Sequence, residues 1–300
     1  MSAVAWRSYH LFRPHPWDEF LRDAVSPFLE RFAVPPLIER FFFIRYWERG
    51  PHIRLRLETP AASELDAYIY DHFNAYFARS PSQRIEEGVG DCFPNDSVQI
   101  IPYEPEVERY GGPSLISLAE DQFQASSRAV LGLLAGEGWC YERALGAAFQ
   151  MHLMFANAIG FQRESLAGFL SGAAEGWLSQ ARPGEEIDLE WRRKTFENAY
   201  TRDREAFAGT YATLWPALDD GDELEQEWAA GWVEDTRLIA RRLRQVSGAD
   251  AGSFTARERS IFISFMHMTN NRLGLRTADE AYLAHVLNRA VQECTSAVLD

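Results

Sequence analysis

Two arginines one residue apart are the first candidates for chemistry. In the run His52–Glu58, polar and apolar residues alternate, which is typical of a strand with one face turned toward the core. Arg54 and Arg56 then share the polar face with His52 and Glu58. Two neighbouring guanidinium groups can hold a carboxylate or an enolate oxygen through charge-assisted hydrogen bonds. A half-buried strand whose polar side faces water gives the same pattern, so the pair alone does not decide between the two.

A second group of charges lies in the run Tyr103–Gly112, where three glutamates precede an arginine. Glu106 and Arg109 are three residues apart, so a single turn of chain would let the carboxylate orient the guanidinium. The glycines that follow, Gly111 and Gly112, allow the backbone to turn sharply. An oriented guanidinium would suit a substrate carboxylate, whereas the alternative is a solvated loop with incidental charges.

A histidine late in the chain is the candidate for proton transfer. His267 lies near the end of a predicted helix, with Asn271 four residues later on the same face. Its neighbours Phe265, Met266 and Met268 are apolar, and desolvation among them would favour the neutral, proton-accepting imidazole. A hydrogen-bonded core histidine is the competing interpretation. No two histidines have the spacing of a zinc-binding helix, and we expect no metal site.

The elements that must position these residues form an early β-rich part and a later helical part. The first third predicts strands over Trp6–Arg13, Phe41–Trp47, His52–Glu58 and Val98–Tyr103. It also predicts helices over Trp17–Phe32, broken at Pro27, and over Ala61–Ala78. Glu48–Pro51 has the composition of a hairpin turn. The remainder predicts helices over Leu115–Leu134, Tyr141–Ile159, Arg163–Gln180, Leu189–Leu214, Glu223–Val246, Thr255–Leu273 and Ala278–Val298.

This pattern predicts an α+β fold, with a small, mostly antiparallel sheet in the N-terminal third packed with a helical majority. We expect a single domain over residues 1–300, with a β-rich part of about 1–112 and a helical part of about 113–300. Gly274 is the expected stop of the helix that carries His267.

Composition excludes several classes of protein. The 300 residues are 46% hydrophobic and 25% charged, which is typical of a folded globular chain and not of a disordered one. A net charge of −14 argues against direct binding of nucleic acid, which usually needs a basic surface. The chain has neither a phosphate-binding loop nor a dinucleotide fingerprint, so no cofactor is expected.

The compartment is also predicted. Three cysteines lie far apart, without the paired spacing of a disulfide framework or a zinc site, which favours a reducing compartment. Met1–Pro16 has no apolar core of signal-peptide length. The most apolar stretch, Leu145–Phe161, is interrupted by polar residues and predicts a buried helix instead of a membrane span. We therefore expect a cytoplasmic protein without membrane contact.

Taken in order, the three segments resemble the C-terminal elimination domain of class I lantibiotic dehydratases. The same domain occurs as a separate small protein in thiopeptide-type bacteriocin pathways. The resemblance covers essentially the whole chain. It is carried by Phe42–Tyr46 with Arg49–Arg56, by Pro105–Gly112, and by His267 with Asn271–Leu273.

The resemblance implies a specific chemistry. In this family a glutamylation protein uses glutamyl-tRNA to esterify serine or threonine of a precursor peptide. The elimination domain then expels glutamate, which leaves dehydroalanine or dehydrobutyrine. The implied partners are therefore the glutamylated precursor peptide and a separate glutamylation protein, and a homodimer is left open. The family's functional positions correspond here to Arg54, Arg56, Glu106, Arg109 and His267, all of which are present.

Elementary chemistry agrees with these roles. The α-proton of a peptide residue is very weakly acidic, so its removal needs a positioned base and cationic stabilisation of the enolate. His267 is the candidate base, and Arg54 or Arg56 would face the oxyanion or assist the departure of the carboxylate. Arg109, oriented by Glu106, would hold the glutamyl carboxylate. The division of acid and base among Arg54, Arg56 and His267 stays open.

Two other functions remain to be separated from elimination. The pyridine synthases are a branch of the same fold that condenses two dehydroalanines by a formal cycloaddition and releases the leader peptide. A non-catalytic accessory subunit would instead present the precursor peptide to a partner, and its acidic surface would attract a basic peptide segment.

Overall fold

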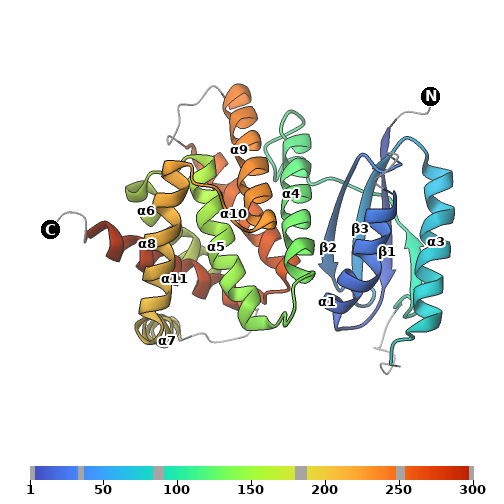
Figure 1. Ribbon diagram of the computed structural model, residues 1–300, viewed down its shortest axis with the longest axis horizontal. Helices are drawn as coiled ribbons and strands as arrows, with labels where there is room; N and C mark the ends of the chain where they lie inside the picture. Colours follow the sequence, from blue (N-terminus) through green and yellow to red (C-terminus); the bar gives the residue numbers. More distant parts are fainter. Residues whose placement is uncertain (1–3, 33–36, 84–90, 180–187, 248–253, 297–300) are drawn as a thin grey trace. The chain divides into compact units, whose positions relative to one another are not determined.

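The computed structural model describes residues 4–32, 37–83, 91–179, 188–247 and 254–296. The contacts between Cα atoms divide the chain into two compact units. The first unit comprises residues 1–107 and 123–139, and the second comprises residues 108–122 and 140–300. A small antiparallel sheet lies in the first unit, and the second is helical (Figure 1). The α+β class predicted from the sequence is confirmed.

The four strands lie close to their predicted positions. They follow the order β2-β3-β1-β4, and each neighbouring pair is antiparallel. The predicted β2–β3 hairpin is confirmed, and Gly50 in its turn has a φ of 112°. β4 ends before the predicted Tyr103, because Pro102 cannot donate a ladder hydrogen bond. The strands are β1 (Ala5–Phe12), β2 (Arg40–Tyr46), β3 (His52–Thr59) and β4 (Ser97–Ile100).

The two faces of the sheet differ in composition, as the alternation along β3 predicts. Leu55 is fully buried and lies opposite Tyr9 of β1, so both side chains occupy the same face. The Tyr9 hydroxyl donates a hydrogen bond to Asp66 of helix α3 (Ala62–Arg79), which places α3 over this apolar face. The opposite face carries Arg54 and Arg56.

The predicted break at Pro27 is wrong. The helical run continues from α1 (Trp17–Phe20) through a π-helical segment η1 (Leu21–Val25) into α2 (Ser26–Phe32). A proline removes one main-chain donor, and its ring collides with the carbonyl four residues earlier. The wider π-helical turn directly before Pro27 accommodates both effects without ending the helix.

Helix α4 (Ile116–Leu134) has residues in both units, with Phe123 as the first that belongs to the sheet-containing unit. Within that unit, the Gln124 side-chain oxygen accepts a hydrogen bond from the Phe41 amide at 2.9 Å, and the Ser127 hydroxyl accepts one from the Phe43 amide at 3.2 Å. These amides belong to the outer edge of β2. The helix therefore satisfies donors that would otherwise be open to a foreign strand.

The second unit is built around α5, which is buried on most of its surface. α5 packs against α8, α9 and α10, and α11 packs against α6 and α8. The single helix predicted over Leu189–Leu214 is wrong, since Asp203 has non-helical backbone angles and separates α7 from α8. The helices are α5 (Tyr141–Ile159), α6 (Arg163–Ser179), α7 (Leu189–Arg202), α8 (Arg204–Asp220), α9 (Glu227–Ser247), α10 (Ala256–Leu273) and α11 (Thr277–Ser296).

Helix α10 has well-defined ends. Thr255 caps its start by accepting a hydrogen bond from the Glu258 amide, and Glu258 bonds back to the Thr255 backbone. Its predicted stop at Gly274 is confirmed, with a φ of 81° that favours glycine. The chain then enters α11 after two further residues, so the helix carrying His267 is rigidly terminated at both ends.

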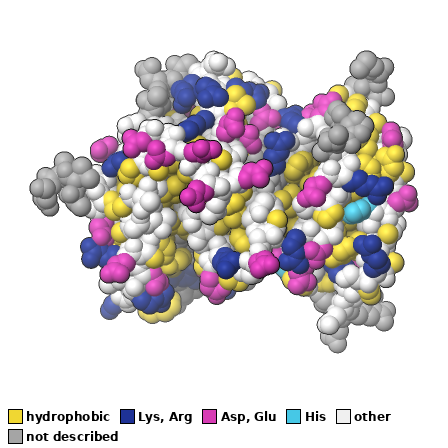
Figure 2. Space-filling view, in the orientation of Figure 1, with side chains coloured by type: hydrophobic (Ala, Val, Ile, Leu, Met, Phe, Trp, Pro, Cys, Tyr) yellow, Lys and Arg dark blue, Asp and Glu magenta, His cyan; other side chains and the backbone are white. Residues whose placement is uncertain are grey.

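Acidic and basic side chains are interspersed over the face shown in Figure 2. Among the residues described, no helix combines the length and the apolar character needed to cross a bilayer.

Candidate active site

Arg54 is held in place on three sides within the first unit. Its Nε donates a hydrogen bond to His52 Nε2 at 3.3 Å, and its Nη2 donates one to the Glu48 carboxylate at 2.8 Å. Its guanidinium carbon lies 3.5 Å from the centre of the Tyr46 ring, which is close cation–π contact. The side chain is 17% exposed, so the group is oriented and still reachable from solvent.

Arg56 lies on the same face of β3 and rests against aromatic rings. Its guanidinium carbon is 4.3 Å from the centre of the Tyr103 ring and 5.3 Å from that of Phe42. Like Arg54, it is half-buried. Stacking on aromatic faces fixes a planar guanidinium without neutralising its charge. The pair therefore forms an oriented, cationic strip on the sheet.

Two buried histidines lie beside these arginines. His10 of β1 is opposite Arg54 and stacks on His52, with ring centres 4.9 Å apart and planes inclined by 17°. The pKa of His10 is lowered to about 3 and that of His52 to about 4, mainly by burial and in part by the nearby Arg54 charge. Both imidazoles are therefore neutral near neutral pH, and the positive charge of this face belongs to the arginines.

The hydrogen bonds of His52 also fix its tautomer. Its Nδ1 lies 2.7 Å from the Gly50 carbonyl oxygen, which can only accept, so Nδ1 carries the proton. Nε2 is then the acceptor for Arg54. His10 is not among the predicted site residues, because its position next to Arg54 depends on the β1–β3 register and not on local spacing.

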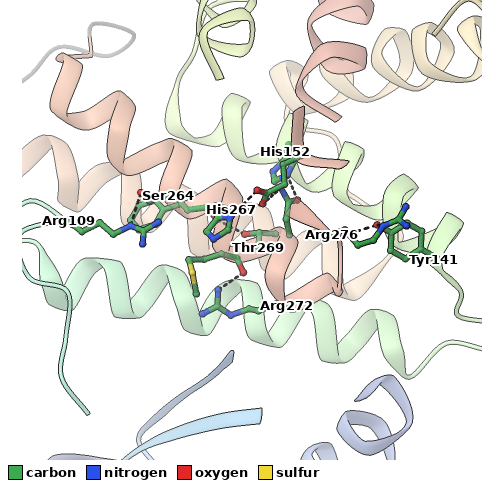
Figure 3. A network of polar contacts seen from close by, with 12 residues as sticks. Arg109, Tyr141, His152, Ser264, His267, Thr269, Arg272 and Arg276 are labelled. Carbon is green, nitrogen blue, oxygen red and sulfur yellow. Dashed lines mark hydrogen bonds and ion pairs between the residues drawn. The ribbon is translucent and has the colours of Figure 1, made fainter. Parts of the chain in front are cut away.

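In the second unit, His267 contacts a buried carboxylate. Its Nδ1 lies 2.8 Å from one oxygen of Glu280 and 3.0 Å from the other (Figure 3). Its own side chain is 34% exposed, whereas that of Glu280 is 2% exposed. The apolar neighbours Phe265 and Met266 are buried on the core side of α10. The sequence predicted that apolar residues enclose His267. Instead, the side chain of His267 is partly exposed to solvent and contacts the Glu280 carboxylate.

Two further residues lie behind Glu280. Asn270 Nδ2 donates to the Glu280 carboxylate at 3.2 Å, and Asn270 Oδ1 lies 2.8 Å from His152 Nε2. Asn270 is fully buried and His152 is 3% exposed. Figure 3 shows His152 and His267 in the same network of polar contacts. None of these supporting residues was predicted; the available signal for Glu280 is its place in the first helical turn after Gly274.

Arg109 is anchored to the same helix as His267. Its Nε donates a hydrogen bond to the Ser264 hydroxyl at 3.2 Å, and Ser264 precedes His267 by three residues on α10 (Figure 3). The neighbouring Tyr110 stacks on Phe265 with ring centres 5.7 Å apart. The turn in which the sequence predicted a functional arginine therefore brings Arg109 to α10, the helix that carries His267.

The five predicted residues thus fall into two groups. Arg54 and Arg56 lie together in the first unit, and Arg109 and His267 are associated with α10 in the second. Glu106 belongs to the first unit and is exposed; its pairing with Arg109 stays a prediction. Within the described ranges, no three histidine, cysteine or acidic side chains are grouped so as to hold a metal ion.

Comparison with known proteins places the chain in a family. Residues 6–291 match the family described as lantibiotic biosynthesis dehydratase C-term. The chain is 30% identical over 138 residues to the epidermin biosynthesis protein EpiB of Staphylococcus epidermidis, and 40% identical over 91 residues to the subtilin biosynthesis protein SpaB of Bacillus subtilis. These matches cover 44% and 30% of this chain but 12% and 8% of the relatives, so the chain matches only a small part of their length.

Solved structures share the fold at low identity. The pyridine synthase TbtD from thiomuracin biosynthesis has a TM-score of 0.77 at 19% identity, with 96% of this chain and 98% of TbtD covered. TsrL has a TM-score of 0.70 at 18% identity, over 97% and 95% of the two chains. The tRNA-dependent lantibiotic dehydratase MibB from Microbispora sp. 107891 has a TM-score of 0.66 at 21% identity, over 99% of this chain and 29% of MibB. The chain therefore belongs to the lantibiotic biosynthesis dehydratase C-terminal family.

Proposed function

We propose that this protein is a lyase that eliminates glutamate from glutamylated serine or threonine residues of a ribosomal precursor peptide. The observation that carries the proposal is the contact between His267 and the buried Glu280, because a solvent-accessible imidazole backed by a carboxylate is suited to proton abstraction. Family membership and the presence of Arg54, Arg56 and Arg109 support it.

The proposed step breaks two bonds, Cα–H and Cβ–O, and forms two, an N–H bond on His267 and the second bond between Cα and Cβ. His267 takes the proton from Cα of the esterified residue, the electron pair forms the Cα–Cβ double bond, and the Cβ–O bond breaks. Glutamate leaves with the electrons of that bond as a free carboxylate. The products are dehydroalanine from serine or dehydrobutyrine from threonine. No oxidant or co-reactant is required.

The arginines supply charge stabilisation in this proposal. Proton removal places negative charge on the peptide carbonyl oxygen, and an oriented guanidinium stabilises such an enolate through charge-assisted hydrogen bonds. Arg54 and Arg56 take this role or assist the departing carboxylate. Arg109 holds the glutamyl group, and Glu106 orients Arg109.

The proposal also assigns the partners. A separate glutamylation protein that uses glutamyl-tRNA prepares the ester, and this chain meets the modified peptide in the cytoplasm without binding the tRNA. Two observations support this division of labour: the chain's fold corresponds to 29% of the tRNA-dependent dehydratase MibB, and its net charge of −14 disfavours phosphate binding.

The likeness to TbtD supports a second candidate, a pyridine synthase that joins two dehydroalanines in a formal cycloaddition. One experiment separates the two functions. The purified protein is incubated with a peptide carrying a glutamyl ester on serine and, separately, with a peptide that already contains two dehydroalanines. Elimination predicts dehydroalanine and free glutamate from the first peptide and no change in the second. Cyclisation of the second peptide together with an unchanged first peptide would reject the proposed lyase.

A further inference from the structure

The polar residues behind His267 form one continuous hydrogen-bonded chain. It runs from His267 to Glu280, from Glu280 to Asn270 and from Asn270 to His152, across helices α10, α11 and α5. Beyond His267, every member is at most 3% exposed. Buried polar groups impose their donor and acceptor pattern on one another, because an unmatched group cannot turn to water.

The pattern starts at the carboxylate. Glu280 in its charged form has only acceptors, so Asn270 must direct its NH₂ group toward it and its carbonyl oxygen toward His152. His152 must then donate from Nε2. Burial lowers the pKa of His152 to about 4, so its ring is neutral and carries this one proton.

The same carboxylate dictates the state of His267. Nδ1 of His267 lies within hydrogen-bond distance of both Glu280 oxygens and must donate to them. In the neutral ring, Nε2 then carries no proton, so its lone pair can accept one.

We propose that Glu280 is a positioning residue, held by Asn270 and His152, that fixes His267 as the Nδ1–H tautomer and so makes Nε2 the atom that accepts the substrate proton. The inference about catalysis rests on the proposed elimination, whereas the assignment of tautomers does not. It predicts opposite tautomers for two histidines of one unit: Nδ1–H for His267 and Nε2–H for His152.

The test is ¹⁵N NMR of the full chain labelled at its histidines, at mildly alkaline pH, where a histidine of ordinary pKa is neutral. The resonances of His267 and His152 are assigned from their disappearance in His267→Asn and His152→Gln. The unsubstituted protein is expected to show a protonated Nδ1 in His267 and a protonated Nε2 in His152. A protonated Nε2 in His267 would overturn the proposal without any need for a further variant.

Glu280→Gln tests the cause. Asn270 still needs an acceptor, so the new amide presents its oxygen to Asn270 and its NH₂ group to His267. His267 is then expected to change to the Nε2–H tautomer. Glu197→Gln is the matched control, because Glu197 pairs with His285 in the same unit and its loss should move only the His285 resonances.

Kinetics on the glutamylated peptide complete the test. Glu280→Gln is expected to lower kcat by about 100-fold, the lower range for a positioned general base, with little change in KM. An unchanged tautomer and an unchanged kcat in this variant would overturn the inference even if the protein is an active lyase. Predicted tautomers in a protein that releases no glutamate would support the tautomer assignment and reject the proposed function instead.

Discussion

Arg54 shows how a single side chain can be prepared for a substrate. It donates hydrogen bonds to neutral His52 and to the exposed Glu48, and it stacks on the ring of Tyr46. These contacts fix the plane of the guanidinium, and they remove most of the entropy that an arginine would lose on binding an anion. The carboxylate of Glu48 is 66% exposed, so a substrate anion can compete with it at low cost.

Arg54→Lys is expected to lower the rate of dehydroalanine formation by about 100-fold. The planar guanidinium can donate to His52 and to an enolate oxygen at the same time, whereas an ammonium group cannot reproduce this arrangement of donors. Mass spectrometry of the peptide product measures the rate. Arg22→Lys is the control, because Arg22 pairs with Asp23 in an exposed ion pair of the same unit. A fully active Arg54→Lys enzyme would exclude a bidentate role for this arginine.

Arg109 is expected to act on binding more than on chemistry. Its hydrogen bond to Ser264 leaves it exposed beside α10, as suits a group that grips the carboxylate of the leaving glutamate. Arg109→Ala should therefore raise KM by about tenfold or more, a loss of at least about 1.4 kcal/mol, with a smaller effect on kcat. Steady-state kinetics with Arg193→Ala, which removes an exposed arginine of the same unit, provides the comparison. An effect on kcat alone would contradict the assignment.

At the scale of elements, the helix that bears His267 could be located from its spacing, and Gly274 from its residue type. The contact of His267 with Glu280 could not, because it depends on how α11 returns against α10 after a short connection. The sheet shows the same division. Alternation along β3 predicted which residues share a face with Arg54, whereas the approach of His10 required the register between strands distant in sequence.

Gly111 lies in the turn that carries Arg109 and is close to α10. Its φ is 96°, and a Cβ added there would lie 2.5 Å from the Leu115 side chain and 3.1 Å from that of Ile261. Gly111→Ala is therefore expected to destabilise the protein by roughly 2 kcal/mol and to weaken peptide binding through Arg109.

The control for this prediction is Gly209→Ala in the middle of α8, where nothing lies within 4 Å of the added Cβ. That change should stabilise the protein by about 0.5–1 kcal/mol through helix propensity. Urea unfolding followed by tryptophan fluorescence measures both. Equal effects of the two substitutions would show that the turn at Gly111 is not constrained.

For the whole molecule, buried imidazoles in both units make stability sensitive to acid. His10 and His52 in the first unit and His152 in the second have pKa values lowered to about 3, 4 and 4 by burial. At pH values between these lowered pKa values and the ordinary histidine pKa of 6.5, the three histidines are protonated in the unfolded chain but neutral in the folded one. Their contribution to stability is complete above about pH 6.5 and falls as the pH drops toward 4.

Each of these histidines should lower the free energy of unfolding by on the order of 3 kcal/mol once the pH has fallen to its folded-state pKa. Carboxylates lose stability over part of the same range, so the measurement compares the unfolding free energy of the unsubstituted protein with that of His152→Gln from neutral pH to about pH 4.5. The variant is expected to show the shallower decline. Identical slopes would mean that His152 does not remain neutral in the folded protein.

The central claim is that this protein eliminates glutamate from a glutamylated peptide and that Arg56 and His267 are each needed for the reaction. The most direct measurement is the single-turnover release of glutamate from a peptide bearing a glutamyl ester on serine, in the unsubstituted protein, in Arg56→Ala and in His267→Ala. Circular dichroism confirms that each variant is folded, and a peptide-binding measurement confirms that it still takes up substrate. The account predicts stoichiometric glutamate and dehydroalanine from the unsubstituted protein, and a loss of at least about 100-fold in each variant. Release at the original rate in either folded, peptide-binding variant would contradict it.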